Sequence, residues 1–292
     1  MKRVLVVAPS GVAPADRVEL GRQALLRAGF EVELPTPPSG PRHYLAGPDD
    51  HRAQELLSAI ERDDVDLVWA LRGGFGAVRT WERLDPARVA RAMRRNPRPL
   101  VGFSDITVLV NALAAFGAPM VHGPVVTQFA DLTEEARAAV LDALTRGPQG
   151  PLPFRDSTVL RSGEARGVLR GGNLATLASL VGTSAMPPLH DSVVFLEDVG
   201  EPVYRLDRML CQLRQSGSLA GARALLLGSF SGVAAGELGA LEHLLREVGE
   251  WFPGPVLTGL RVGHTPDNHA VWVGAEVTVV AGAHVAAAEY LP

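Results

Sequence analysis

Short apolar runs alternate with helix-like segments through the first half of the chain, and this alternation constrains the fold more than any other feature. The first apolar run is Val4–Ala8, and a helical pattern from Asp16 to Ala28 follows it. Strands that alternate with helices are typical of βα units, whose strands pair in parallel. We therefore predict a parallel sheet that also contains Glu31–Leu34, Leu67–Leu71, Leu100–Phe103 and Met120–His122.

Further helices are predicted between these strands. Arg52–Arg62 and Ala87–Arg95 have helical patterns, and the clearest helix begins after Ser104. Its apolar residues recur at i, i+3, i+4, i+7 and i+8, which places one apolar stripe against the sheet. They are Ile106, Leu109, Val110, Leu113 and Ala114.

The composition changes near Thr145, where we place a domain boundary. Residues 146–153 (Arg-Gly-Pro-Gln-Gly-Pro-Leu-Pro) cannot continue a helix and make a poor central strand. A chain of 292 residues with 47% hydrophobic content can form two domains with separate cores. We predict an N-terminal parallel-sheet α/β domain over residues 1–145, a linker over 146–165 and a smaller C-terminal domain over 166–292. In the second half we predict strands at Gly167–Leu169, Val193–Leu196, Ala224–Leu227, Ala270–Val273 and Glu276–Val280, and helices at Leu174–Leu180, Tyr204–Gln215 and Ala240–Glu250.

Charge and cysteine content exclude several classes of partner. The formal net charge is −4 and no dense stripe of lysine and arginine occurs, so a nucleic-acid partner is not expected. Cys211 is the only cysteine, which excludes an intrachain disulfide and fits a reducing cytosol. The apolar run Val4–Ala8 is too short for a signal peptide or a membrane span. We expect a cytoplasmic protein with no membrane partner.

Ser104 lies between a predicted strand and the clearest helix. Such a turn exposes a side chain at the carboxyl end of the sheet, where open α/β folds place their sites. The free N–H groups at the start of the helix also favour a developing oxyanion there. Ser104 or Asp105 would equally make a good helix N-cap. Ile106 stands where a lipase-type Gly-x-Ser-x-Gly turn has its second glycine, so the segment alone leaves both roles open.

A glycine-rich segment, Arg72–Gly76, follows the strand Leu67–Ala70. Its glycines permit close approach of backbone N–H groups to an anion, so it could complete an oxyanion hole with the amide of Asp105. It could also hold a phosphate, but it has neither the P-loop ending nor the Gly-x-Gly-x-x-Gly spacing. Three glycines in four positions also occur in plain turns.

His264 and Glu197 are candidates for a base and its partner. His264 lies in the polar loop 262–269 before a predicted strand, a place where bases are commonly held and where ordinary turn histidines also occur. Glu197 ends the strand Val193–Leu196 and could orient an imidazole, but Asp198 and Glu201 follow it closely, and the sequence does not choose among the three acids. A metal site of His264, Asp267 and His269 matches no zinc signature, so neither metal nor cofactor is expected.

Together these segments resemble the LD-carboxypeptidase family, which includes the murein tetrapeptide carboxypeptidases and the microcin C self-immunity peptidases. The resemblance covers nearly the whole chain, and its blocks occur in the order expected for the family. They are residues 8–11 (Ala-Pro-Ser-Gly), 72–79 (Arg-Gly-Gly-Phe-Gly-Ala-Val-Arg), 102–107 (Gly-Phe-Ser-Asp-Ile-Thr), 122–124 (His-Gly-Pro), 171–174 (Gly-Gly-Asn-Leu), 196–199 (Leu-Glu-Asp-Val), 204–210 (Tyr-Arg-Leu-Asp-Arg-Met-Leu) and 263–264 (Gly-His).

The resemblance implies an α/β first domain and a smaller, swivelling β/β/α second domain that share a Ser-Glu-His triad. In this chain the triad falls on Ser104, Glu197 and His264. The implied oxyanion donors are the backbone amides of Asp105 and of Gly74 or Gly73. A homodimer is expected from the family alone.

The family also implies a substrate. Its members cleave the amide between an L-configured centre and a terminal D-alanine, so a murein tetrapeptide is the expected substrate. Arg72, Arg79 or Arg205 could receive a substrate carboxylate, because a guanidinium binds carboxylate through two parallel hydrogen bonds. Two alternatives stay open: a microcin-type peptidase that acts on peptidyl-nucleotides, and a non-catalytic nucleotide- or peptide-binding protein that uses Arg72–Gly76 as an anion cradle.

Overall fold

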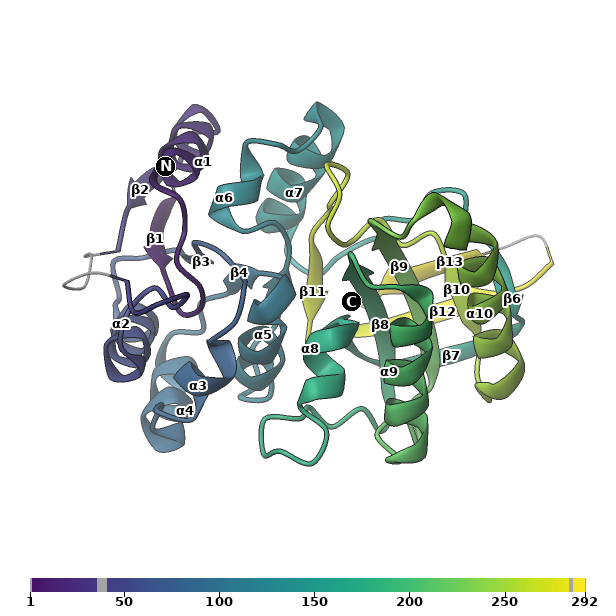
Figure 1. The fold of residues 1–292 in the computed structure, drawn as a ribbon. Helices are drawn as coiled ribbons and strands as arrows, with labels where there is room; N and C mark the ends of the chain where they lie inside the picture. Colours follow the sequence, from purple (N-terminus) through teal and green to yellow (C-terminus); the bar gives the residue numbers. More distant parts are fainter. Residues whose placement is uncertain (1, 36–40, 284–285, 292) are drawn as a thin grey trace.

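The chain forms two sheets that lie side by side (Figure 1). The computed structural model describes residues 2–35, 41–283 and 286–291. The first sheet has the order β11-β5-β4-β3-β1-β2, in which β1 to β5 are parallel and β11 pairs antiparallel to β5. These strands are β1 (Arg3–Val7), β2 (Glu31–Glu33), β3 (Leu67–Ala70), β4 (Leu100–Gly102), β5 (Met120–His122) and β11 (Val271–Val273).

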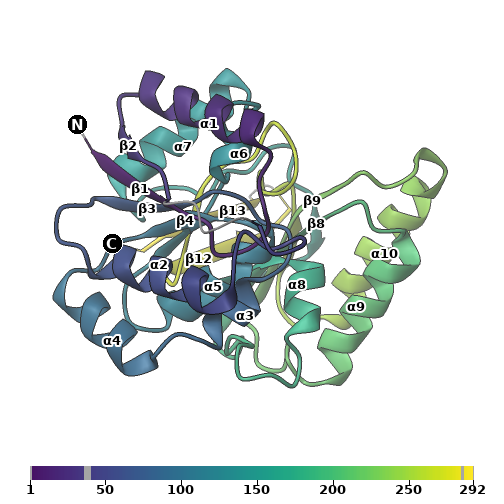
Figure 2. The ribbon, with the colours of Figure 1, turned by 60° about the vertical axis from the view of Figure 1, so that its left-hand side comes forward.

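Helices cover both faces of the first sheet (Figure 2). One face carries α1 (Ala15–Arg27), α6 (Val126–Phe129) and α7 (Glu134–Arg146), and the other carries α2 (Asp49–Glu61), α3 (Ala77–Trp81), α4 (Pro86–Arg95) and α5 (Thr107–Ala114). Alternate residues of a strand point to opposite faces. Accordingly, Val4 and Val6 pack with α1 and α7, whereas Leu5 and Val7 belong to the core beneath α2 and α5.

The second sheet has the order β13-β12-β7-β8-β9-β10-β6. Its central strands β7 to β10 are parallel, and β12 pairs antiparallel to both β7 and β13. The strands are β6 (Val159–Arg161), β7 (Gly163–Asn173), β8 (Ser192–Val199), β9 (Ala224–Ser231), β10 (Val256–Thr258), β12 (Glu276–Ala281) and β13 (Ala286–Tyr290), and the helices of this half are α8 (Leu174–Ser179), α9 (Val203–Gln215) and α10 (Leu238–Trp251).

The two faces of β8 have different neighbours. Val194 and Leu196 pack with α9 and α10, whereas Val193 and Phe195 belong to the core that also contains residues of the first sheet. This shared core continues from one sheet to the other, and α5, α8 and β11 lie where the two halves meet (Figure 1). Strand alternation therefore directs one face of β8 toward the first half of the molecule.

The structure confirms the predicted α/β fold with a parallel-rich first sheet and a second sheet. Strand membership, however, departs from the predicted domain ranges at two places. β11 lies in the range predicted for the C-terminal domain yet pairs with β5 in the first sheet. β6 lies in the predicted linker yet pairs with β10 in the second sheet. The domain ranges themselves and the swivelling of the second domain stay predictions.

The predicted elements omit several that the structure contains: α3, α6, α7, β6, β10 and β13. Most are short. α7 is long and has a helical pattern, because its buried Ala136, Val140 and Leu144 recur every four residues. Local periodicity could therefore have located α7, whereas β6 and β10 depend on each other for their pairing.

Candidate active site

Ser104 stands in a strained turn at the carboxyl end of β4. Its φ of +62° lies in the left-handed region, which costs a non-glycine residue about 1–3 kcal/mol and is enriched at functional sites. A short 3₁₀ turn, Ser104–Ile106, follows and leads directly into α5. Gly102 makes the turn tight, because a Cβ at this position would lie 2.7 Å from the side chain of Ile106. With this backbone conformation Ser104 differs from an ordinary N-cap residue, which has an extended conformation.

The glycine loop after β3 borders the Ser104 turn. A Cβ on Gly73 would lie 2.9 Å from Ser104 Oγ and 3.4 Å from the amide nitrogen of Asp105. Gly74 has a φ of +101°, which favours glycine, and the carbonyl of Gly73 accepts a hydrogen bond from the amide of Gly11 at 3.1 Å. The structure therefore places the backbones of two predicted oxyanion donors, Asp105 and Gly73, next to the hydroxyl group of Ser104, and Gly74 follows in the same loop.

Glu197 and His264 form a hydrogen-bonded pair. Nδ1 of His264 lies 2.8 Å from Oε2 of Glu197, whose side chain is fully buried, whereas the imidazole is 20% exposed. A carboxylate can only accept hydrogen bonds, so Nδ1 is the donor; in the neutral imidazole this leaves Nε2 with its lone pair. This is the tautomer that a general base requires.

Gly263 permits this pair to form. It has a φ of +128°, and a Cβ at this position would lie 2.2 Å from Ser229 Oγ and 3.0 Å from Glu197 Oε2. Any other residue would push the loop away from the carboxylate. The hydroxyl of Ser231 also donates to the carbonyl of His264 at 3.1 Å, which fixes the loop on β9.

The other two candidate acids have different partners. Asp198 accepts hydrogen bonds from the side chain of Asn173 and from the amides of Ala175 and Val199. Burial nevertheless raises the pKa of Asp198 above its ordinary value. Glu201 forms a 3.5 Å ion pair with Arg205. Of the three acids, Glu197 is the one that contacts His264.

The pair reaches the edge of the first sheet where Ser104 stands. The ring centroids of Phe103 and His264 are 4.5 Å apart, so the imidazole lies against the residue that precedes Ser104. Among the described residues Ser104 Oγ has no hydrogen-bond partner. Catalytic hydrogen bonds are often long without substrate and shorten in the complex.

Hydrogen bonds between α5 and β7 fix the first half of the molecule against the second. The side chain of Asn111 on α5 both donates to the carbonyl of Gly171 and accepts from its amide, at 2.8 and 3.2 Å. Thr107 Oγ1 accepts from the amide of Asn173 at 3.1 Å, and Asn173 lies opposite Glu197 in the β7–β8 pairing. The helix that follows Ser104 is thus anchored beside the strand that carries Glu197.

His122 is a residue near the site to which the sequence analysis assigned no role. It is fully buried, and its ring lies between those of Phe103 and Phe195, with centroids 6.0 and 4.8 Å away. Neither ring nitrogen has a hydrogen-bond partner among the described residues. Burial, and to a smaller extent the charge of His264, lowers the pKa of His122 to about 3. The block His-Gly-Pro contained the only signal that could have drawn attention to it.

The three candidate arginines lie in different settings. Arg72 donates to the carbonyl of Val12, and within the described residues it has no carboxylate partner. Arg79 is paired with Asp49 at 2.6 Å, which raises the pKa of the Arg79 guanidinium. Arg205 is paired with Glu201 and is half exposed. Of the three, Arg72 belongs to the glycine loop itself.

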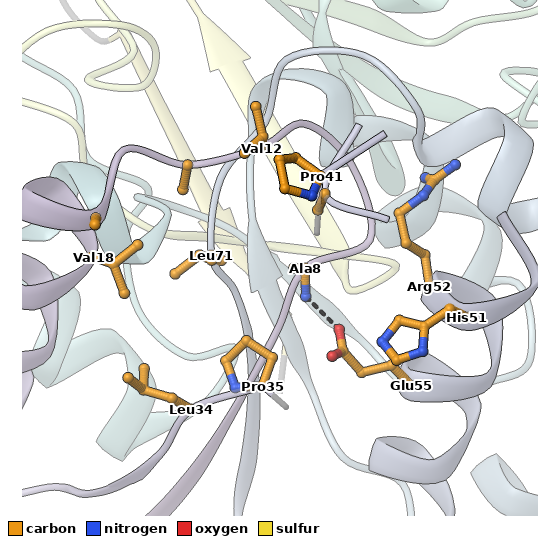
Figure 3. Close-up of a pocket in the computed structure, with 13 residues that line it drawn as sticks. Ala8, Val12, Val18, Leu34, Pro35, Pro41, His51, Arg52, Glu55 and Leu71 are labelled. Atoms are coloured by element: carbon orange, nitrogen blue, oxygen red, sulfur yellow. Dashed lines mark hydrogen bonds between the residues drawn. The ribbon is translucent and has the colours of Figure 1, made fainter. Parts of the chain in front are cut away.

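An apolar cavity of about 360 Å³ is lined in part by Leu71, the residue that precedes the glycine loop (Figure 3). It lies at the carboxyl ends of β1 and β3, and its walls include Val12, Leu34 and Leu71. Glu55 Oε2 accepts from the amide of Ala8 at 2.6 Å, and burial raises the pKa of the Glu55 carboxyl group. Ser104, Glu197 and His264 are not among the residues that line this cavity.

Neither a metal cluster nor a membrane span emerges from the described residues. No group of three or more histidine, cysteine, aspartate and glutamate side chains converges there in a way that could hold a metal ion. Asp267, a member of the considered His264, Asp267 and His269 set, is bound to Arg261. No helix in the described parts of the chain combines the length and the apolar character needed to cross a bilayer.

Known proteins match the chain along most of its length. The model of the LD-carboxypeptidase N-terminal domain matches residues 4–123, and that of the LD-carboxypeptidase C-terminal domain matches residues 166–279. The murein tetrapeptide carboxypeptidase of Pseudomonas aeruginosa is 34% identical over 96% of this chain and 93% of its own. A probable murein peptide carboxypeptidase of Bacillus subtilis is 30% identical over 94% of this chain and 87% of its own.

Solved structures agree with these sequence matches. The muramoyltetrapeptide carboxypeptidase of Oxalobacter formigenes superposes with a TM-score of 0.87 at 29% identity and covers 100% of this chain and 99% of its own. MccF in complex with glutamyl sulfamoyl guanosine also superposes at 0.87, over 100% of this chain and 96% of its own, but at 20% identity it shares the fold alone. The relatives named as carboxypeptidases support peptidase activity. The chain belongs to the LD-carboxypeptidase family.

Proposed function

We propose that this protein is a serine-type LD-carboxypeptidase in which Ser104 is the nucleophile, His264 the general base and Glu197 the residue that orients the base. One observation carries the proposal: the 2.8 Å contact between Glu197 and His264, at the edge of the sheet that carries the strained Ser104 turn. A serine, an imidazole and a buried carboxylate in this order are the parts of a nucleophilic triad.

In the proposed reaction Nε2 of His264 accepts the proton of Ser104 as Oγ attacks the scissile carbonyl carbon. The oxyanion of the tetrahedral intermediate then receives hydrogen bonds from the amides of Asp105 and of Gly74 or Gly73. His264 gives its proton to the leaving amine, D-alanine departs, and an ester on Ser104 remains. Water attacks this ester with His264 again as base, which releases the shortened peptide and returns the proton to Ser104.

A murein tetrapeptide is the substrate that we propose, because the relatives matched over nearly their whole length carry the names of murein peptide carboxypeptidases. Arg72 is our first candidate for a substrate carboxylate, because it stands in the glycine loop and has no carboxylate partner among the described residues. Arg79 and Arg205 would first have to exchange their present partners. A cytoplasmic location and a homodimer complete the proposal.

Release of D-alanine from a murein tetrapeptide, followed by chromatography, tests the proposal. We expect turnover by the wild type and a fall of at least about 10⁴-fold in Ser104→Ala, since the loss of a triad nucleophile costs this much or more. Ser58→Ala, which removes an exposed hydroxyl on α2, is the matched control and should keep full activity. Undiminished turnover in Ser104→Ala would refute the serine mechanism.

The same assay with a peptidyl-nucleotide separates the two peptidase alternatives. Preferred cleavage of the peptidyl-nucleotide would move the protein to the microcin type. Calorimetric binding of a nucleotide, without hydrolysis of either substrate, would instead favour an anion cradle at Arg72–Gly76 in a non-catalytic protein.

A further inference from the structure

The side chains of a buried polar cluster beneath the Ser104 turn take no part in the proposed chemistry. It consists of Ser10, Arg52 and Asp105, whose exposed fractions are 0%, 1% and 6%. These residues come from three different segments: the loop after β1, helix α2 and the turn after β4. Buried charged and polar groups are costly unless they are hydrogen-bonded, so the bonds that this cluster makes define its role.

The carboxylate of Asp105 joins two loops to the Ser104 turn. Its Oδ2 atom accepts the hydroxyl hydrogen of Ser10 and, at 2.7 Å, the amide of Ala77. Ala77 directly follows the glycine loop, and Asp105 directly follows Ser104. One oxygen atom therefore fixes the end of the loop and the start of the 3₁₀ turn relative to each other.

Among the described residues the guanidinium of Arg52 makes no hydrogen bond to Ser10 or Asp105; it binds the loops on either side of them and is paired with Asp49. It donates to the carbonyls of Pro9 and Gly76 at 2.7 and 2.8 Å and to Thr80 Oγ1 at 2.5 Å. Gly76 has a φ of +137°, and a Cβ there would lie 2.8 Å from the guanidinium. The planar, multiply donating head group of arginine suits this role, which a lysine ammonium could not reproduce. Arg52 thereby ties the loop after β1 to the end of the glycine loop.

We propose that Ser10, Arg52 and Asp105 are positioning residues that set the distance between the glycine-loop amides and the Ser104 turn. The inference rests on the proposed function of that site. The φ of +62° at Ser104 is unfavourable, and such strain persists only where surrounding contacts over-determine it. A displacement of about 1 Å can lower the rate about 10²-fold, so the cluster acts on the chemical step through geometry.

A double-mutant cycle on Ser10→Ala and Asp105→Asn tests the proposal. Both variants keep the main-chain amide of residue 105. Ser10→Ala removes the donor of the hydrogen bond that joins the two side chains, and Asp105→Asn removes the negative charge of its acceptor. For D-alanine release from a murein tetrapeptide, we expect each to lower kcat by about 10- to 100-fold with KM changed less than about threefold. The double variant should fall little further than either single variant, because the two residues act through one bond.

Ser58→Ala provides the matched loss of a hydroxyl outside the cluster and should leave kcat and KM at wild-type values. Thermal unfolding of each variant shows whether it is folded at the assay temperature. If one single variant is unfolded, the kcat and KM of the other single variant test the proposal. Wild-type kcat in the folded variants, a change confined to KM, or fully additive losses would each overturn the proposal.

Amide hydrogen exchange of the segment 73–77 separates this proposal from the proposed function, because it needs no substrate. We expect faster exchange of these amides in Ser10→Ala than in wild type or Ser58→Ala. If the wild type releases no D-alanine, the proposed function fails, and the exchange rates alone decide whether the cluster holds the loop. Unchanged exchange in Ser10→Ala would overturn the inference in either case.

Discussion

The nucleophile side and the acid–base side of the candidate site are held in different ways. Ser104 and the glycine loop follow neighbouring parallel strands, and the buried bonds of Asp105 and Arg52 connect their loops. His264 lies on a loop after the second sheet's parallel core, and its ring is oriented by a single carboxylate, that of Glu197. The nucleophile side is thus fixed by several redundant bonds, and the imidazole by one.

Because of this difference, we expect substitutions on the two sides to differ in whether they change the stability of the fold or the catalytic rate. Substitutions on the nucleophile side should disturb the backbone that several loops share, whereas substitution of Glu197 should change the imidazole alone. Two results would contradict this difference: a substitution on the acid–base side that changes stability, or one on the nucleophile side that leaves activity intact.

After Ser104→Ala, the largest effect is expected for Glu197→Gln. The amide has nearly the volume of the carboxylate, but it no longer fixes the tautomer of His264 or stabilises an imidazolium, so kcat should fall about 10⁴-fold. The midpoint of thermal unfolding should change little, because among the described residues Oε1 of Glu197 has no partner to lose. Turnover of a murein tetrapeptide and thermal unfolding, measured on the same preparation, check both statements.

Glu201→Gln is the matched control for this variant, because it neutralises a nearby glutamate that pairs with Arg205. It should retain most of the wild-type kcat. A larger loss in Glu201→Gln than in Glu197→Gln would reverse the assignment of the acid.

The sequence predicted the nucleophile side better than the acid–base side for a physical reason. A strand, a turn and a helix occupy consecutive residues, so the position of Ser104 at the strand-to-helix turn follows from local periodicity. The partner of His264 does not, because it depends on which residue of β8 faces the first sheet. Local patterns left Glu197, Asp198 and Glu201 equivalent, and the resemblance to a family selected Glu197.

Contacts between distant segments account for what the sequence did not predict. Nothing in residues 271–273 indicates that β11 leaves its neighbours and pairs with β5. Arg52 was predicted only as a residue of a helix, and Ser10 only as part of a family block. Their roles depend on carbonyl groups and a carboxylate from other loops, which no local pattern brings together.

A smaller effect on activity is expected from Gly73→Ala, which adds a single methyl group on the nucleophile side. The new Cβ would lie 2.9 Å from Ser104 Oγ, so either the loop or the serine must shift, and oxyanion hydrogen bonds are sensitive to such shifts. We expect kcat to fall about 10²- to 10³-fold, the range for loss of one oxyanion donor. Steady-state kinetics with the murein tetrapeptide measure this change.

Gly239→Ala is the control for added bulk, because a Cβ at this helical position has no atom within 4 Å. It should leave kcat unchanged and stabilise the protein slightly, since alanine is the better helix former. Full activity in Gly73→Ala would mean that the loop does not border the reacting oxygen, and the contrast between the two sides would no longer hold.

The smallest effect concerns stability at acidic pH and comes from His122, where the two sides meet. The pKa of His122 is about 3 in the folded protein, below its ordinary value of 6.5, so the unfolded chain binds a proton that the folded protein does not between these values. Stability should therefore decrease as the pH falls through this window, by about 1.4 kcal/mol per pH unit for this one group. His122→Gln cannot bind the proton and should escape that loss.

Urea unfolding at pH 6.5 and at pH 5 measures the difference. The wild type should lose about 2 kcal/mol more than His122→Gln over this interval, because the contributions of the carboxylates cancel between the two proteins. His243→Gln, which replaces an imidazole that is 69% exposed, should follow the wild type. Parallel losses in wild type and His122→Gln would show that His122 is not buried as a neutral ring between Phe103 and Phe195, and that the two sides do not share this core. A selective loss in the wild type would instead place an acid-sensitive residue at their junction.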